Sequence, residues 1–420
     1  MVGVPHSTGC SLCRERRIKC RKYGRPCPGY QRTFRFQDER PALERRHQSS
    51  VTRSTSITQS TRPRPRSIPD AAAAVRENAL AMMQQQSPTS PSQMQTQTHA
   101  QPHLIEEFIA SAFCTLYFHN RFRFASQTDF PAYIARNAGS KPFQDAAVAC
   151  LVCVYRAYQM QDHALLKTSR HMYAQALREV VAGLYGEDAL SADMLSSMMM
   201  LAVYEMYART SRDAWAVHVD GVRRLMVSRG AAAHQRGLGR SNYIAFRGFL
   251  IAAAVQEGRP CILDEDEWRW LSGRVQIEDA AKQGSAARFV DVTERVFQEI
   301  VQCPRYLSEA MQGSATVGSD IHRARVRLTP LIMELRRAIE TQVQTSDGDQ
   351  GPSLLLLGAE TTLTLLDDLL RRQRSDGRFS PFRVVSGLSK GSSYGMTWPD
   401  QVASSMGMLG TVIVDDGPCT

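Results

Sequence analysis

The sequence lacks any apolar run near the ~20 residues that a membrane-spanning helix requires. The apolar stretch "FLIAAAV", Phe249 to Val255, has only seven residues. The opening "MVGVPHSTG" has neither the basic n-region nor the apolar h-region of a secretory signal. We therefore expect an intracellular protein. Its cysteines should be thiols or metal ligands, because disulfides are rare in a reducing compartment.

The motifs that usually carry catalysis are also missing. No Gly-rich phosphate loop, paired-carboxylate site or nucleophile elbow stands out. There is no internal repeat, and segments with the alternating pattern of strands are few. An enzyme would need a cleft with convergent titratable groups, and nothing in the sequence points to one. We therefore predict that the protein is not an enzyme.

Acidic residues are scarce in one part of the chain only. Residues 1–66 contain 16 Arg and Lys against 4 Asp and Glu, whereas all 420 residues contain 51 against 41. The remainder, with 35 against 37, is close to neutral. A basic arm on a near-neutral body indicates a polyanion partner that the arm alone contacts. Nucleic acid is the first candidate, and an anionic membrane surface is the second.

Composition divides the chain into four parts. Residues 1–36 are basic and rich in cysteine, with few aliphatic side chains. Residues 37–103 are rich in Arg, Ser, Thr, Pro and Gln and have little to bury, which predicts a disordered linker. Residues 104–385 show helical periodicity and are predicted to form one all-α domain of several helices. The segment 386–420 is rich in Gly and Ser and is predicted to be a weakly structured tail.

The helical prediction depends on apolar residues that recur at steps of three, four and seven. One such face contains Leu166, Tyr173, Leu177, Val180 and Leu184. Gly183 and Gly186 lie where this helix should end.

Further boundaries follow from single residues. Ser191 is predicted to cap a helix that is apolar nearly all round and therefore lies in the centre of the core. Gly230 is predicted to end the segment "DAWAVHVDGVRRLMVSR". Pro330 is predicted to kink or break its helix.

Most conspicuous side chains of this domain are interpreted as core. Trp215, Val219, Val222 and Met226 recur at helical steps, and Met198, Met199 and Met200 suit the role of adaptable filler. Cys150 and Cys153 form a CxxC pair without further Cys or His at ligand spacing, so this pair is also assigned to packing.

Two polar residues of the same domain need separate interpretations. His218 is interpreted as a hydrogen-bonded interior histidine rather than a metal ligand. For Glu205, two alternatives stay open, burial with an arginine partner such as Arg223 or exposure to a groove.

Four cysteines lie close together in the basic arm, in the spacing Cys10-x2-Cys13-x6-Cys20-x6-Cys27. A CxxC pair places two sulfurs near each other, which suits tetrahedral zinc with Zn–S bonds of ~2.3 Å. Because a segment this short has no apolar core, a metal would have to supply its folding energy. The alternative is four unconnected thiols in a disordered basic tail.

The two halves of this arm resemble the zinc binuclear cluster of fungal transcription factors. "GCSLCRERRIKC" matches the start of that module, and "CRKYGRPCPGY" resembles its end. The resemblance implies a nuclear regulator of RNA polymerase II genes, with six cysteines that hold two zinc ions. It also implies that the first helix enters the DNA major groove and reads a CGG-type triplet.

The arm departs from the family pattern at one point. "RRIKC" joins "RKYGRPC" directly, where the family has a further stretch that contains Cys-x2-Cys. Two of the six ligands are therefore missing. Cys10, Cys13, Cys20 and Cys27 could still close one tetrahedral zinc site, which gives one Zn²⁺ per chain. Whether an omitted stretch in the gene sequence or a real loss explains the junction stays open.

The resemblance assigns base reading to Arg17, three residues before the third cysteine. Arginine can bond guanine O6 and N7 in a bidentate manner. The other assigned DNA contacts are Arg14, Arg16 and Lys19 beside it and Arg21, Lys22 and Arg25 on phosphates. The alternative is a basic cluster that serves only as a nuclear localisation signal.

Residues 104–270 resemble the fungal-specific transcription factor domain that often follows such a cluster. Tyr204, Glu205, Trp215, His218 and Gly221 occur in that family's order and spacing. The resemblance implies a regulatory domain that binds a coregulator or a small-molecule effector, and it leaves the existence of a homodimer open. We thus expect a nuclear, zinc-dependent transcription regulator that binds double-stranded DNA and no membrane. The alternative is a helical regulatory protein whose degenerate arm no longer reads DNA.

Overall fold

The structure is a computed structural model that describes residues 130–415, apart from residues 212, 283, 344–350 and 387–396. Helices dominate this part of the chain, which confirms the predicted all-α fold class. The α-helices are α6 (Phe130–Asn137), α7 (Pro142–Met160), α8 (His163–Gly183), α9 (Ala192–Ala208), α10 (Ala214–Arg229), α11 (Gly237–Gln256), α12 (Asp266–Ala280), α13 (Ala287–Ile300), α14 (Cys303–Met311), α15 (Val317–Val343), α16 (Gly351–Arg372) and α17 (Trp398–Ser404). Short 3₁₀ turns lie at Glu187–Leu190, Ala231–His234, Ile262–Asp264 and Gly284–Ala286.

Helices α7 to α10 form a first packed group, in which α7 contacts α8 and α9, and α9 contacts α10. Local sequence explains where they begin and end. The Asp162 side chain accepts hydrogen bonds from the backbone N–H groups of Ala164 and Leu165 and caps α8. This helix ends at Gly183, and α10 ends just before Gly230, whose φ is +73°. Both endings confirm the predictions.

Helix α9 is the centre of this group. Ser191 accepts a hydrogen bond from the backbone N–H of Met194 at 3.0 Å, as its capping role predicts. Most of the helix is buried, including Met198, Met199 and Met200. An α-helix that is apolar nearly all round must be enclosed on several sides, and α7, α8, α10 and α11 all contact it.

A second group consists of α12 to α16, in which α13 contacts α12 and α15, and α15 contacts α16. Helix α15 runs through Pro330, so the predicted break does not occur. Pro330 is exposed, and the apolar face of α15 remains buried on both sides of it, with Leu328, Leu331 and Leu335 in the core. Tertiary packing of that face outweighs the loss of one helical hydrogen bond.

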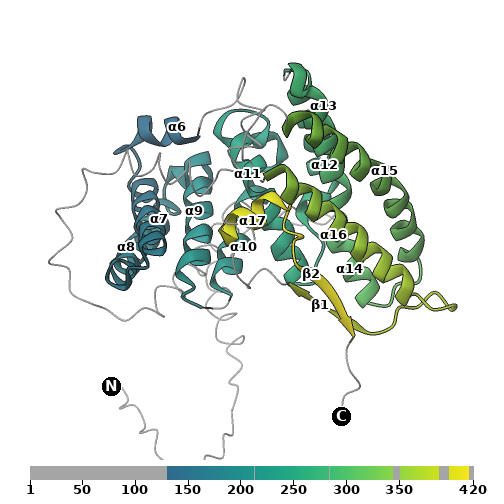
Figure 1. The fold of residues 1–420 in the computed structure, drawn as a ribbon. Helices are drawn as coiled ribbons and strands as arrows, with labels where there is room; N and C mark the ends of the chain where they lie inside the picture. Colours follow the sequence, from purple (N-terminus) through teal and green to yellow (C-terminus); the bar gives the residue numbers. More distant parts are fainter. Residues whose placement is uncertain (1–129, 212, 283, 344–350, 387–396, 416–420) are drawn as a thin grey trace, which may run out of the picture. The chain divides into compact units, whose positions relative to one another are not determined.

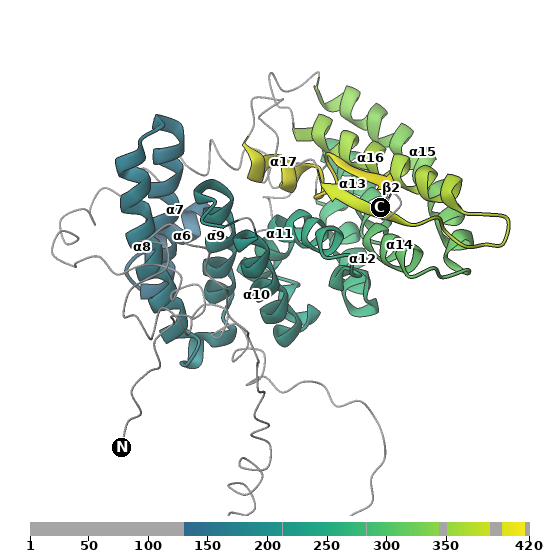
Figure 2. The same ribbon diagram turned by 90° about the horizontal axis from the view of Figure 1, so that it is seen from below.

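Helix α11 lies between the two groups and contacts α9 and α10 on one side and α14 on the other (Figures 1 and 2). Its polar side chains reach both groups from within the core. Asn242 donates to the carbonyl of Ala192 at 2.9 Å. Arg247 forms a bidentate pair with Glu294 of α13, at 2.7 and 2.9 Å.

The Arg247–Glu294 pair is almost completely buried, with side chains 1% and 0% exposed. The Arg247 guanidinium also lies 4.1 Å from the ring centroid of Phe297. Burial alone would lower the pKa of Arg247, but the Glu294 carboxylate more than offsets this and raises it. The guanidinium therefore stays charged inside the core.

The segment after Ser386 is more structured than its composition predicts. Strand β1 (Phe382–Ser386) pairs antiparallel with β2 (Thr411–Asp415), and Phe382 is opposite Asp415. Helix α17 contacts α11, α16 and α9, so the chain returns to the centre of the helical domain. A weakly structured tail is thus not what residues 398–415 form. The predicted boundaries at 36, 103 and 104 lie outside the described residues.

We predict that Glu294→Ala lowers the free energy of unfolding by about 3 to 5 kcal/mol, because Arg247 would stay buried without its partner. Chemical denaturation followed by circular dichroism measures this change. The matched control is Glu360→Ala, which removes an ion pair with Arg336 on the surface. The control should cost less than about 1 kcal/mol. Equal losses of unfolding free energy in the two variants would contradict the interpretation that Glu294 compensates a buried charge on Arg247.

Candidate functional site

The metal-ligand and DNA-contact residues that the sequence predicts lie outside the described residues. They are Cys10, Cys13, Cys20 and Cys27 for zinc and Arg14, Arg16, Arg17, Lys19, Arg21, Lys22 and Arg25 for DNA. Their assignments stay predictions. Among the residues that the structure describes, no group of three or more His, Cys, Asp or Glu side chains could hold a metal ion.

The described part of the chain contains a buried polar cluster, which we define as Ser169 and Tyr173 of α8, Tyr204 and Glu205 of α9, and His218 of α10. The Tyr173 hydroxyl lies 2.6 Å from His218 Nε2. The Tyr173 ring stacks on Tyr204 with centroids 4.3 Å apart and planes 7° from parallel. Ser169 Oγ lies 3.3 Å from the Tyr204 hydroxyl. Five polar side chains from three helices thus meet inside the first group.

His218 is neutral at physiological pH. Its side chain is buried, and burial lowers its pKa to about 3. The hydrogen bond with Tyr173 satisfies one ring nitrogen without adding charge. This confirms the interpretation of His218 as a hydrogen-bonded interior histidine.

The two tyrosines of the cluster are also neutral. Burial raises the pKa of Tyr173 well above its usual range, and the nearby Glu205 carboxylate raises it further. Burial likewise raises the pKa of Tyr204. Neither phenol can therefore act as a base at neutral pH, so the role of the pair is to pack and to donate hydrogen bonds.

Glu205 is buried, which settles one of the alternatives left open by the sequence. Its Oε2 accepts hydrogen bonds from Thr210, at 2.6 Å from the hydroxyl and 3.2 Å from the backbone nitrogen. Arg223 is not its partner, because Arg223 Nε donates instead to Asp220 at 2.8 Å. Burial raises the pKa of Glu205, and the Thr210 hydrogen bonds offset part of this rise.

The CxxC pair in α7 serves packing, as predicted. The thiol of Cys150 donates to the Ala147 carbonyl at 3.2 Å, and that of Cys153 donates to the Leu165 carbonyl at 3.6 Å. Both side chains are buried and form no disulfide. Burial raises the pKa of Cys153 to about 11, so its thiol is protonated and unreactive at neutral pH.

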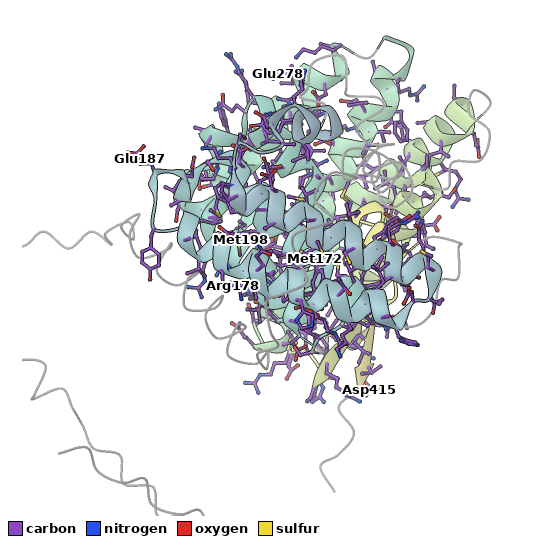
Figure 3. The ribbon with its side chains drawn as sticks, turned by 90° about the vertical axis from the view of Figure 1, so that its left-hand side faces the viewer. Met172, Arg178, Glu187, Met198, Glu278 and Asp415 are labelled. Carbon is purple, nitrogen blue, oxygen red and sulfur yellow. The ribbon has the colours of Figure 1, made fainter. Side chains whose placement is uncertain are left out.

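The side chains assigned to the core from helical spacing are also buried. They are Trp215, Val219, Val222 and Met226 on α10 and Met198, Met199 and Met200 on α9. Figure 3 looks at the first helix group from its outer side, where Arg178 and Glu187 project from the surface.

The arrangement of the buried polar cluster suits a structural role. Its groups are neutral or partnered by hydrogen bonds, and together they tie α8 to α9 and α10. The sequence did not reveal Ser169 and Tyr173 as partners, because they are separated from Tyr204 and His218 by 35 and 45 residues. The only available signal was that Tyr173 belongs to the apolar face of its helix.

None of the described helices is both long enough and apolar enough to cross a lipid bilayer. This agrees with the short apolar runs of the sequence.

Comparison with known proteins assigns part of the described region to a family. Residues 142–259, from α7 to just beyond α11, match the family described as fungal specific transcription factor domain. A protein of Emericella nidulans described as uncharacterized is 38% identical over 161 residues, which cover 38% of this chain and 34% of that protein. The chain therefore covers about a third of this relative's length. No solved structure matches the chain.

The matched region lies within residues 104–270, where the sequence resembles the same domain, and it contains the whole buried polar cluster. A fungal-specific transcription factor domain is thus present in this chain. It supports a role in transcription regulation rather than catalysis.

We predict that His218 makes the domain sensitive to acid. The folded pKa of about 3 is below the ordinary histidine value of about 6.5, so the unfolded chain binds the proton more tightly. The contribution of neutral His218 to the stability of the folded domain is complete above pH 6.5 and is lost as the pH falls toward 3. Urea denaturation of wild type and His218→Gln at several pH values between 7.5 and 4.5 should show it as a difference in stability between the two proteins that shrinks by about 1.4 kcal/mol per pH unit below 6, since groups such as Asp400 titrate equally in both.

His218→Gln keeps a polar partner for Tyr173 but cannot titrate in this range. It should lower stability at pH 7.5 and lose less stability than wild type on acidification. The matched control, His163→Gln, changes an exposed histidine on α8 and should keep the pH dependence of the wild type. The same pH dependence in wild type and His218→Gln would show that His218 is not the group responsible.

Proposed function

We propose that this protein is a nuclear, zinc-dependent transcription regulator that binds double-stranded DNA in a sequence-specific manner. One observation carries the proposal. The same chain contains the cysteine-rich basic arm "GCSLCRERRIKC" and, at residues 142–259, a fungal-specific transcription factor domain. The concentration of positive charge in residues 1–66 supports DNA as the partner of the arm.

Zinc is the cofactor in this proposal. Four thiolates suffice for one tetrahedral ion, so we propose one Zn²⁺ per chain, held by Cys10, Cys13, Cys20 and Cys27. The two-zinc cluster of the related factors needs six cysteines. A stoichiometry of one would therefore distinguish this arm from its relatives.

The DNA-reading element in this proposal is the helix that follows Cys13. Arg17 contacts guanine in a CGG-type element, and the surrounding arginines and lysines contact neighbouring bases or phosphates. The helical domain regulates by binding a coregulator or a small-molecule effector. Whether a homodimer forms is a question for sedimentation of the full chain.

A second candidate function is favoured by the cysteines that are missing. The junction "RRIKCRKYGRPC" has two cysteines fewer than the family module. On this hypothesis the arm no longer reads DNA, and the protein acts through contacts of its helical domain with other proteins. Residues 1–36 would then serve nuclear import or contact DNA without regard to sequence.

Zinc analysis and DNA binding of the full chain separate the two candidates. One zinc per chain, with a preference for CGG-containing duplex over scrambled duplex, supports the first. Absence of zinc, together with DNA binding that is sensitive to salt but indifferent to sequence, would contradict the first candidate and support the second.

Arg17→Ala should reduce discrimination between CGG-containing and scrambled duplex by about 1 to 3 kcal/mol, the worth of a bidentate guanine contact. Lys22→Ala is the control, because a phosphate contact carries no sequence information and its loss should weaken all duplexes equally. Fluorescence anisotropy at fixed salt measures both. Uniform weakening by Arg17→Ala would contradict the base-reading assignment.

Cys13→Ser should release the zinc and unfold the arm, since the metal supplies the arm's folding energy. The melting of the helical domain should not change, because its described helices pack against one another in a core of their own. Metal analysis and circular dichroism melting test the two parts separately. A lower melting temperature of the helical domain would show that the arm contributes to its stability.

A further inference from the structure

The C-terminal segment Thr397–Asp415, which we call the strap, connects parts of the domain that are far apart in sequence. It contains α17 and β2, and it contacts α9, α11 and α16 as well as β1. The Tyr207 hydroxyl of α9 donates to Thr397 Oγ1 at 3.1 Å, across 190 residues. The Trp398 ring meets Trp215 of α10 edge to face, with centroids 5.5 Å apart.

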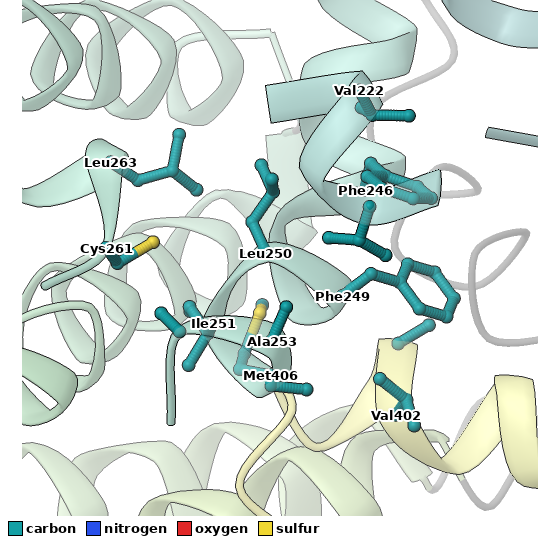
Figure 4. Close-up of a cluster of buried hydrophobic side chains, with 14 of the residues drawn as sticks. Val222, Phe246, Phe249, Leu250, Ile251, Ala253, Cys261, Leu263, Val402 and Met406 are labelled. Atoms are coloured by element: carbon teal, nitrogen blue, oxygen red, sulfur yellow. The ribbon is translucent and has the colours of Figure 1, made fainter. Parts of the chain in front are cut away.

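The strap fits its site by direct contact between backbones. A Cβ atom on Gly248 of α11 would lie 2.6 Å from the Val402 carbonyl oxygen. On Gly358 of α16 it would lie 2.2 Å from the carbonyl oxygen of Ser405. Figure 4 shows Val402 and Met406 beside apolar side chains of α11, including Phe249 and Ile251. The close approach of the strap to α11 and α16 therefore requires glycine at both positions.

Three polar side chains of the strap have an unsatisfied atom in this seat. Asp400 is 2% exposed, and its Oδ2 accepts a hydrogen bond from the Thr397 hydroxyl. Its Oδ1 has no hydrogen-bond partner among the described residues. The same holds for Trp398 Nε1 and Thr411 Oγ1. Because a buried carboxylate without a cationic partner is costly, the docked strap favours a protonated Asp400.

Among the described residues, no charged group compensates for the burial of Asp400. Of the helices packed against α17, α9 contributes Tyr207, whose own pKa is raised well above its usual range by burial and by Asp400. No group of α11 or α16 counters the effect of burial. Burial raises the pKa of Asp400 from 3.8 to about 8, and the Thr397 hydrogen bonds offset only part of the rise.

We propose that the strap is a proton-linked latch, which docks between α9, α11 and α16 with Asp400 protonated and gives up that proton when it is released. Release would uncover the apolar seat formed by Gly248, Phe249, Ile251 and Gly358 on α11 and α16. The latch lies in the helical domain and does not depend on zinc or DNA binding by the arm.

The direction of the linkage follows from the two pKa values. In the released strap, Asp400 is exposed to water and has its ordinary value near 3.8, whereas in the docked strap the value is about 8. Docking is therefore strongest below pH 4 and weakens as the pH rises toward 8, above which no further change occurs. Between these limits the opening constant rises about tenfold per pH unit, because one proton is released. Neutral pH lies inside this window.

Hydrogen exchange of the full chain between pH 5 and 7.5 tests the latch. After correction for the pH dependence of intrinsic exchange, protection of peptides within 398–408 should fall about tenfold per pH unit. Peptides from α13 serve as the internal reference for global unfolding and should be more strongly protected than the strap peptides at every pH. Constant protection of the strap, or strap protection equal to that of α13, would overturn the proposal, since the latter would mean that the strap opens only on global unfolding.

Variants identify the group that carries the proton. Asp400→Asn resembles the protonated side chain in shape and should abolish the pH slope of the strap peptides. Asp415→Asn is the matched control, because Asp415 is 75% exposed at the end of β2, and it should keep the wild-type slope. A slope that persists in Asp400→Asn would refute the assignment. If that variant does not fold, the comparison of strap and α13 peptides in the wild type still shows whether the strap opens locally.

Discussion

The burial of α11 along nearly its whole length is the constraint on which the rest of the described fold depends. A helix in this position has no face left for water, so each polar side chain on it needs a partner inside the protein. Arg247 forms an ion pair with Glu294 of α13, and Arg240 forms one with Asp279 of α12. Asn242 donates a hydrogen bond to the backbone at the start of α9. These three contacts place α11 relative to both helix groups, which apolar packing alone would do less specifically.

Two buried polar regions of the domain each enclose a carboxyl group with one oxygen unpaired, Glu205 Oε1 and Asp400 Oδ1. In the polar cluster between α8, α9 and α10, burial lowers the pKa of His218, and Glu205 accepts hydrogen bonds from Thr210 beyond the end of its helix. In the strap, Asp400 accepts a side-chain hydrogen bond from Thr397 of the same short segment. The first arrangement stabilises a fixed structure, whereas the second makes docking depend on a proton. Both follow from the same cost of burying charge.

Much of the fold could be predicted from single residues. Ser191 and Gly230 act at helix ends through local backbone chemistry, so their effects do not require knowledge of distant segments. Pro330 shows the limit of such reasoning, because packing of the helix around it overrides the local preference. For the candidate site, burial of His218 and of the CxxC pair followed from apolar periodicity. The hydrogen-bond partner of Glu205 could not be predicted, because nothing in the local sequence favours Thr210 over Arg223.

The sequence by itself determined the helical class, a few helix ends, the charge of the arm and the spacing of its four cysteines, since these depend on neighbours in the chain. It also indicated the transcription factor domain that the family match locates at residues 142–259. Only the tertiary structure decided which buried polar groups meet, and that a glycine- and serine-rich segment returns to the core as α17 and β2. These contacts join residues tens to nearly two hundred positions apart, and their strength comes from exclusion of water, which no local pattern records.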